Sequence, residues 1–249
     1  MKTIKLEVNG ICKSFDGSEV LKNINFQIDS GEFVVIMGQS GCGKSTLLYC
    51  VSGMDRPTAG KILFENRELS ALSEKETEKM RLQHMGFIFQ KANFLKNLSI
   101  ADNIVFPAFQ LGRQKRNDIV KDADALMQRM GILSVADHDI RKVSGGQLQR
   151  AAICRAMINH PDILFGDEPT GALNSSATKE VMDILGQINK EGTTIMLVTH
   201  DAKVAARADR VIYLEDGKIK DEFISGKYKE SDLPLREKCL KEWLIKMGF

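Results

Sequence analysis

The sequence predicts an α/β fold in which a parallel sheet is covered by helices on both faces. Short apolar runs, each bounded by turn residues, alternate along the chain with longer helical patterns. Continuous apolar runs without polar alternation are typical of strands that are buried on both faces of a parallel sheet. Five strands of this kind are expected, at residues 33–37, 86–89, 163–165, 194–198 and 211–214.

Helical patterns fill the segments between these strands. Six helices are expected, at residues 44–52, 74–84, 114–130, 147–159, 175–190 and 201–207. Ser73 followed by Glu76 is a capping-box signal for the second of them. Residues 92–158 are mostly helical and contain no convincing strand. They are therefore expected to form a helical subdomain, inserted into a core of about residues 1–91 and 159–225.

The tail at residues 226–249 differs in composition from the rest of the chain. Ser231, Asp232 and Pro234 are start signals for a helix. One broad apolar face of that amphipathic helix would carry Leu235, Cys239, Leu240, Trp243, Leu244 and Met247. We expect this face to dock on the chain's own domain, and contact with a second copy or a partner is the alternative.

Composition and charge argue against several classes of protein. The net charge of +2 over 249 residues gives no global basic field that would call for nucleic acid. Five scattered cysteines without a CxxC pair indicate reduced thiols rather than a disulfide framework or a zinc site. Residues 1–15 do not resemble a signal peptide, and no apolar run approaches the ~18–20 residues that cross a bilayer. The sequence therefore predicts a cytoplasmic chain that depends on a partner for any membrane role.

A glycine-rich loop of the form G-x-x-x-x-G-K-[ST] lies between the first expected strand and the first expected helix. The loop consists of Gly38, Gln39, Ser40, Gly41, Cys42, Gly43, Lys44 and Ser45, and Thr46 follows it. Glycines let backbone N–H groups wrap a phosphate, and the helix N-terminus adds partial positive charge. Lys44 is expected to reach the outer phosphates of a nucleoside triphosphate, and Ser45 to offer its hydroxyl to Mg²⁺.

Two acids follow the strand expected at 163–165. Asp167 is a candidate ligand for Mg²⁺. Glu168 is expected on the other side of the pleat, where it would orient and polarise an attacking water as a general base. His200 ends another apolar run at a strand end, where α/β proteins bind ligands, although a lone histidine is more often structural.

A second polar, glycine-rich turn opens the helix expected at 147–159. Residues 143–150 read VSGGQLQR, which predicts a second anion-binding helix N-terminus. The chain lacks the N-K-x-D signal of guanine binding and shows no kinase lid pattern. The chain therefore has two predicted phosphate-binding elements but lacks both the guanine-binding signal and the kinase lid pattern of other nucleotide enzymes.

This turn resembles the LSGGQ signature of ABC ATPases, with Val143 in place of the usual Leu. The resemblance covers about residues 4–224 and is carried by six ordered motifs. It implies a P-loop NTPase fold with a RecA-like parallel-sheet core, an N-terminal antiparallel β part and an inserted helical subdomain. It also implies one ATPase domain at residues 1–225. The further matching positions are Phe15 (adenine stacking), Gln90 (Q-loop), Asp167 and Glu168 (Walker B), residues 172–174 (D-loop) and His200 (switch histidine).

The same resemblance implies the cofactors and the partners. ATP and Mg²⁺ would bind at the phosphate loop, with Ser45, Gln90 and Asp167 as the metal ligands. Two copies would pair head to tail, so that the signature of one copy caps the ATP of the other. The residues acting in trans would be Ser144, Gly145, Gly146, Gln147 and Asn174. An integral membrane permease would hold the ATPase at the inner face of the cell membrane.

Residues 81–108 and the run DEPTGALNSSAT resemble a narrower group, the lipoprotein-releasing, macrolide-export and bacitracin-resistance ATPases (LolD, MacB and BceA). This implies a motor that drives a separate permease and exports or detoxifies an antimicrobial peptide, a macrolide or a lipid-linked substrate. The alternative is the ATPase of a signalling or cell-division complex, acting on a sensor kinase or a cell-wall hydrolase. Soluble ABC proteins of translation or DNA repair usually have tandem cassettes or a long coiled coil, and neither is present in this sequence.

Three local features depart from the family pattern or lie outside it. Asn174 replaces the usual D-loop Asp, which indicates either tolerated variation or altered coupling between the two ATP sites. Cys42 lies inside the phosphate loop, where positive surroundings would favour a reactive thiolate, or where it is simply a small residue that fits. Residues 112–121 are locally basic, as at a solvated helix start.

Overall fold

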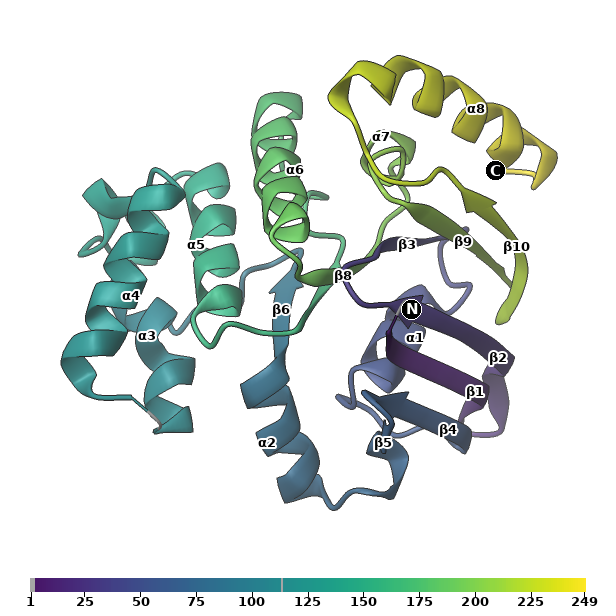
Figure 1. Cartoon of the computed structure of the whole chain (residues 1–249), viewed down its shortest axis with the longest axis horizontal. Helices are drawn as coiled ribbons and strands as arrows, with labels where there is room; N and C mark the ends of the chain where they lie inside the picture. Colours follow the sequence, from purple (N-terminus) through teal and green to yellow (C-terminus); the bar gives the residue numbers. More distant parts are fainter. Residues whose placement is uncertain (1–2, 113) are drawn as a thin grey trace. The chain divides into compact units, whose positions relative to one another are not determined.

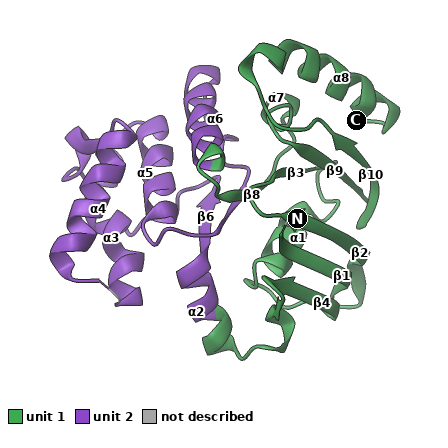
Figure 2. Cartoon of the chain, viewed as in Figure 1, with its two compact units in different colours: residues 1–77, 189–249 green, residues 78–188 purple. Residues whose placement is uncertain are grey.

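The computed structural model describes residues 3–112 and 114–249. The chain divides into two compact units, coloured separately in Figure 2. Unit 1 comprises residues 1–77 and 189–249, and unit 2 comprises residues 78–188. Residues 1 and 2 of the expected core and Arg113 of the basic run lie outside the described residues.

Unit 1 begins with an antiparallel sheet, drawn in purple to blue in Figure 1. Its strand order is β2-β1-β4-β5. The bounds of these strands are β1 (Ile4–Phe15), β2 (Ser18–Asp29), β4 (Ala59–Phe64) and β5 (Arg67–Glu68). This sheet confirms the expected N-terminal antiparallel part of the fold. The β1–β2 turn has positive φ at both Asp16 (46°) and Gly17 (82°), as a two-residue type I′ hairpin requires.

The second set of strands in unit 1 follows the order β10-β9-β3-β8. The bounds are β3 (Phe33–Met37), β8 (Thr194–Val198), β9 (Arg210–Glu215) and β10 (Lys218–Ile224). β3 pairs in parallel with both β8 and β9, and β10 runs antiparallel to β9. Every residue of β3 and of β8 is buried, which is the pattern that their apolar runs predicted.

Three α-helices complete the described part of unit 1. They are α1 (Lys44–Val51), α7 (Ala202–Ala205) and α8 (Leu233–Lys246), with short 3₁₀ turns at η1 (Leu69–Ala71) and η4 (Glu230–Asp232). α8 buries Leu240 and Leu244, but Leu235 is 65% exposed and Cys239 is exposed. The apolar face is therefore narrower than the sequence predicted. Arg236 anchors the helix, because its guanidinium donates to carbonyls of Ala206, Ala208, Ser225 and Gly226.

Unit 2 combines two parallel strands with helices. β6 (Met85–Phe89) pairs with β7 (Ile163–Asp167) in register from Met85 opposite Ile163 to Phe89 opposite Asp167. The helices are α2 (Glu74–His84), α3 (Ile100–Leu111), α4 (Arg116–Arg129), α5 (Gly145–Met157) and α6 (Ser175–Lys190), with η2 (Leu133–Val135) and η3 (Ile140–Lys142). α2 and α6 each begin or end just across the unit boundary. The capping box predicted for α2 is present, with Ser73 and Glu76 bonded to each other.

Most expected bounds agree with the structure, and one correction matters for function. α5 begins at Gly145 rather than at residue 147, because Ser144 is its N-cap. Among the described residues, no helix combines the length and the apolar character that crossing a bilayer requires.

Gly86 shows how closely α5 packs on the strands of unit 2. A Cβ atom at Gly86 would lie 2.5 Å from the carbonyl oxygen of Ala156 in α5 and 2.4 Å from Leu164 Cδ2 in β7. Real Cβ contacts are not this short, so the backbone of α5 rests directly on β6. The close approach requires glycine at this position of β6.

The variant Gly86→Ala is expected to destabilise the protein by about 1–3 kcal/mol, the usual cost of overpacking a close-packed interior. Chemical denaturation monitored by circular dichroism measures this change. Gly186→Ala is the matched control, because the residue is inside α6 and, apart from the backbone of that helix and its chain neighbours, no atom of the described residues lies within 4 Å of a Cβ there. That control is expected to stabilise by roughly 0.5–1 kcal/mol through helix propensity. Equal effects of the two substitutions would contradict the close approach.

Candidate nucleotide site

The phosphate loop joins β3 to α1 within unit 1. Lys44 is buried, and its ammonium donates to the carbonyl oxygens of Gly38 (2.9 Å) and Gln39 (2.8 Å), with Cys42 Sγ 4.0 Å away. α1 begins after Gly43, which has a φ of 104° and supplies no side-chain cap. A buried cation whose partners are two neutral carbonyls and a thiol, beside an uncapped helix start, fits a bound polyphosphate.

Backbone geometry restricts the loop to glycine at Gly38. A Cβ there would lie 2.1 Å from the carbonyl oxygen of Leu214 in β9 and 2.7 Å from Cys42 Sγ. The loop therefore rests directly on the end of β9. Gly41 is different, because no atom of the described residues other than its chain neighbours lies within 4 Å of a Cβ at that position, although its φ of 80° still favours glycine. Gln39, Ser40 and Gly41 are exposed at the outer side of the loop.

Burial of Cys42 acts against the reactive thiolate that positive surroundings would favour. The side chain is buried, and this burial raises the pKa of the Cys42 thiol above its ordinary value, although nearby Lys44 acts in the opposite direction. The protonated thiol is therefore the stable form. The alternative interpretation, a small residue that fits the loop, agrees with the structure.

Phe15 and His200 also lie in unit 1. Phe15 ends β1 directly before the type I′ turn, and its ring is 47% exposed with the Lys13 ammonium 4.7 Å from the ring centroid. An exposed aromatic beside a cation suits stacking of a nucleotide base. His200 is exposed and lies two residues after the end of β8 at Val198, and Asp201 caps α7, which follows it.

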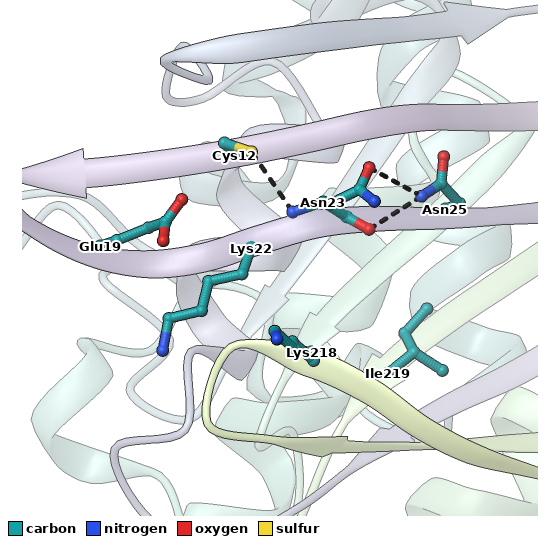
Figure 3. A pocket seen from close by; sticks show the side chains of 7 residues that line it. All are labelled: Cys12, Glu19, Lys22, Asn23, Asn25, Lys218 and Ile219. Carbon is teal, nitrogen blue, oxygen red and sulfur yellow. Dashed lines mark hydrogen bonds between the residues drawn. The ribbon is translucent and has the colours of Figure 1, made fainter.

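A pocket of about 640 Å³ lies between the β1–β2 hairpin and the start of β10, and Figure 3 shows the side chains that line it. Its lining consists of Cys12, Glu19, Lys22, Asn23, Asn25, Lys218 and Ile219. Cys12 Sγ accepts from the Asn23 amide (3.3 Å), and the Asn25 side chain donates to Asn23 (2.8 and 3.1 Å). The pocket contains none of the predicted site residues, and the Asn25 side chain is already held, because its Nδ2 donates to Asn23 and its Oδ1 accepts from the backbone N–H of Gly10 (2.7 Å).

The two acids belong to unit 2, at the end of β7. Asp167 is the last residue of the strand, and Glu168 follows it with a φ of 48°, a left-handed conformation that is unusual for any residue but glycine. The pleat alternation therefore ends at Asp167, and a turn closed by the bond from Gly171 N to Glu168 O (3.0 Å) sets the backbone of Glu168. Such strain is common at functional sites.

The signature turn is an ordered helix cap. Ser144 Oγ accepts from the backbone N–H of Gln147 (3.2 Å), and Gln147 Oε1 accepts from the backbone N–H of Ser144 (2.9 Å). Because this capping uses Ser144 as an acceptor, its hydroxyl hydrogen remains able to donate to an anion. Ser144 and Gly145 are exposed, as a phosphate-capping role in trans requires.

Unit 2 brings Gln90, the signature turn and the D-loop close together. A Cβ at Gly171 would lie 2.8 Å from the side-chain nitrogen of Gln90, and one at Gly146 would lie 3.3 Å from Ala177 Cβ. A Cβ at Gly145 would lie 3.8 Å from Leu173. The three motifs are therefore in contact or nearly so.

That Ser45 of unit 1 shares one Mg²⁺ ion with Gln90 and Asp167 remains a prediction. The oxygen atoms of these three side chains fit that hard cation.

Sequence reasoning missed two polar residues of α5. Gln149 is 4% exposed and donates to the carbonyl of Phe89 (3.2 Å), the residue before Gln90. Arg155 donates to the carbonyls of Ala92 and Asn93, and burial lowers the pKa of its guanidinium to about 10. The sequence signal that could have identified Gln149 and Arg155 is the placement of a polar residue on the buried face of a helix.

Comparison with known proteins decides the family. The family model described as ABC transporter matches residues 21–171, which is more than half of the chain. The chain belongs to the ABC transporter family. The macrolide export ATP-binding/permease protein MacB of Campylobacter fetus is 43% identical over 96% of this chain, which corresponds to 37% of that relative. The probable syringafactin export ATP-binding/permease protein SyfD of Pseudomonas syringae is 41% identical over 88% of this chain and 34% of its own length.

Solved structures give the same family. The ATP-binding cassette MJ0796, a dimer in a post-hydrolysis state with ADP and Pi, superposes with a TM-score of 0.83 and 34% identity, covering 90% of this chain and all of that one. The protein cbiO1 of Clostridium perfringens superposes with a TM-score of 0.82 and 30% identity over 99% of this chain and 98% of that one. The chain is thus an ABC-type ATPase cassette, with the expected P-loop fold. It spans about a third of the length of the curated relatives that it matches.

Asn174, which replaces the usual Asp of the D-loop, has a structural role within its own chain. Its Oδ1 accepts from the backbone N–H of Ala177 (2.9 Å), so it caps the N-terminus of α6. Asn174→Ala is expected to lower the free energy of unfolding by about 1 kcal/mol, whereas Asn174→Asp leaves it nearly unchanged, because Asn and Asp cap equally well. Denaturation midpoints measure both. A large loss of stability for Asn174→Asp would contradict the capping role.

Proposed function

We propose that the chain binds Mg-ATP in two composite sites of a head-to-tail homodimer and hydrolyses it to drive a membrane permease. The observation that carries this proposal is the buried Lys44 ammonium, which closes the phosphate loop and has no carboxylate partner among the described residues. A triphosphate would supply the missing negative charge. The uncapped start of α1 and the exposed ring of Phe15 support a nucleotide in that position.

Each residue of the proposed site has its own role in binding or hydrolysing ATP. Lys44 and the N–H groups of residues 38–46 hold the phosphates, and Phe15 stacks on the adenine. Ser45, Gln90 and Asp167 hold Mg²⁺, which neutralises phosphate charge. Glu168 orients and polarises the attacking water, and His200 contacts the γ-phosphate beside it. From the second copy, Ser144 donates its hydroxyl, Gly145, Gly146 and Gln147 complete the cap, and Asn174 contacts across the dimer.

The cargo is proposed from the relatives. Their names describe export of macrolides and of syringafactin by proteins that join an ATP-binding part to a permease. We therefore favour export of an antimicrobial peptide, a macrolide or a lipid-linked molecule over a signalling or cell-division role. In this assembly the chain works at the inner face of the cell membrane, and no nucleic acid takes part.

Glu168→Gln tests the catalytic assignment. The variant should keep ATP binding and lose turnover by about 10²–10⁴-fold, because the water loses its base while the phosphate contacts remain. Light scattering should then detect an ATP-dependent dimer that the wild type forms only transiently. Glu242→Gln removes the same charge from an exposed position of α8 and should change neither property. Wild-type hydrolysis by Glu168→Gln would remove this residue from the catalytic role.

Mixing two inactive variants tests the action of Ser144 in trans. A Lys44→Ala homodimer and a Ser144→Arg homodimer each have two defective sites. Their heterodimer has one site with both defects and one site with intact Lys44 and intact Ser144. That site should occlude one ATP per heterodimer, measured by filter binding after purification through two different affinity tags. A purified heterodimer that occludes no ATP would contradict the head-to-tail arrangement.

A further inference from the structure

The tail that follows β10 approaches the phosphate loop inside unit 1. Gln39 Nε2 donates to the carbonyl oxygen of Gly248 at 3.5 Å, a long hydrogen bond between the exposed side of the loop and the segment after α8. Lys220 Nζ donates to the neighbouring carbonyl of Met247 (3.3 Å) and also bonds Glu215. Two consecutive carbonyls of the tail are therefore held by other parts of unit 1, that of Met247 by Lys220 of β10 and that of Gly248 by Gln39 of the loop.

A specific helix ending directs the chain to this position. Phe249 N donates to Leu244 O (3.1 Å), and Gly248 N donates to Ile245 O (3.1 Å). With Gly248 at a φ of 84°, these two bonds form the Schellman motif, which reverses the chain after a helix. The reversal turns Phe249 back toward the sheet.

Tyr213 receives the returning chain. Its ring is fully buried and meets Phe249 edge-on at 6.2 Å and Trp243 edge-on at 6.1 Å between centroids. Trp243 is fixed in turn by a bond from Nε1 to Asp221 Oδ2 (2.8 Å) and by contact with Phe223 at 5.5 Å. The three aromatic side chains, Tyr213, Trp243 and Phe249, are called the aromatic cluster below.

The aromatic cluster lies directly behind the phosphate loop. Tyr213 is the β9 partner of Met37, the residue before Gly38. Leu214, the next residue of β9, presents the carbonyl oxygen that leaves no room for a Cβ at Gly38. Because interiors are close-packed, a displacement of this strand end is transmitted to Gly38 and Gln39 rather than absorbed. Those two residues supply the carbonyls that hold Lys44.

We infer that Phe249 and Trp243 are positioning residues for the phosphate loop, and that the tail braces the loop in its nucleotide-binding conformation. Phe249 fixes β9 from behind through Tyr213, and the Gly248 carbonyl holds the Gln39 side chain from outside. The inference rests on the proposed nucleotide site. It adds that the affinity of this site depends on a segment that contributes no phosphate contact of its own.

The variant Phe249→Ala tests the brace. Its ring is 43% exposed, so its loss leaves the buried anchors of α8 in place. Affinity for Mg-ADP, measured by calorimetry, should fall about threefold to tenfold, the size expected when one aromatic contact stops restraining a binding loop. KM for ATP should rise by the same factor with kcat unchanged, because the lost restraint acts on binding alone.

Matched variants separate positioning from general stability. Ile245→Ala removes a large apolar side chain from the same helix at a position 71% exposed, and it should leave Mg-ADP affinity unchanged. Tyr213→Phe keeps both ring contacts and removes only a buried hydroxyl that has no hydrogen-bond partner among the described residues, so this variant should also bind Mg-ADP normally. In the double variant Phe249→Ala with Gln39→Ala, the two losses should be less than additive if both act on one loop conformation.

Hydrogen exchange supplies a readout that needs no nucleotide. Amides of residues 37–43 should exchange faster in Phe249→Ala than in wild type or Ile245→Ala. Unchanged exchange together with unchanged Mg-ADP affinity would overturn the brace. If the wild type itself bound no Mg-ADP, the proposed function would fail, whereas faster exchange in Phe249→Ala would still support the brace.

Discussion

Burial of a lysine is unfavourable unless polar groups surround its ammonium. In this chain the ammonium of Lys44 finds the carbonyls of Gly38 and Gln39, and the position of those carbonyls depends on much of unit 1. β3 delivers the loop, β9 lies directly against Gly38, and Gly43 starts α1 in a conformation that only glycine adopts readily. The restriction on each of these glycines follows from the need to hold one cation where an anion can reach it.

Unit 2 depends on a comparable set of contacts, in which polar side chains of α5 donate to backbone carbonyls outside the helix. Its N-terminus carries the signature turn, its middle supplies Gln149 to the carbonyl before Gln90, and its last turn supplies Arg155 to the carbonyls of Ala92 and Asn93. The Arg155 guanidinium also stacks over Phe94 at 4.4 Å. One helix thus fixes both Gln90, which is proposed to bind Mg²⁺, and the residues proposed to cap the second ATP.

The sequence predicted the strands and motifs whose signal is local. β3 and β8 were located to the residue because all their side chains are buried, and α6 because its apolar face repeats regularly. The long strands β1 and β2 were expected only through the family resemblance. Their pairing contains several register shifts that disturb the alternation of buried and exposed residues. The Asp16-Gly17 turn between them was a usable hairpin signal. The contact partners of Arg155 and Phe249 could not be predicted, because each lies far away in sequence.

The absence of any side chain at Gly86 has a mechanical consequence. Because the backbone of α5 rests on β6 with no intervening atoms, the helix cannot roll or slide without the strand moving as well. The 13 residues of α5 form a rod of about 20 Å, at about 1.5 Å per residue. We therefore expect a displacement at the signature end to move the Arg155 end as well, with little bending of the helix. Stiffness of this kind suits the proposed coupling between phosphate binding at one end of α5 and a movement at its other end.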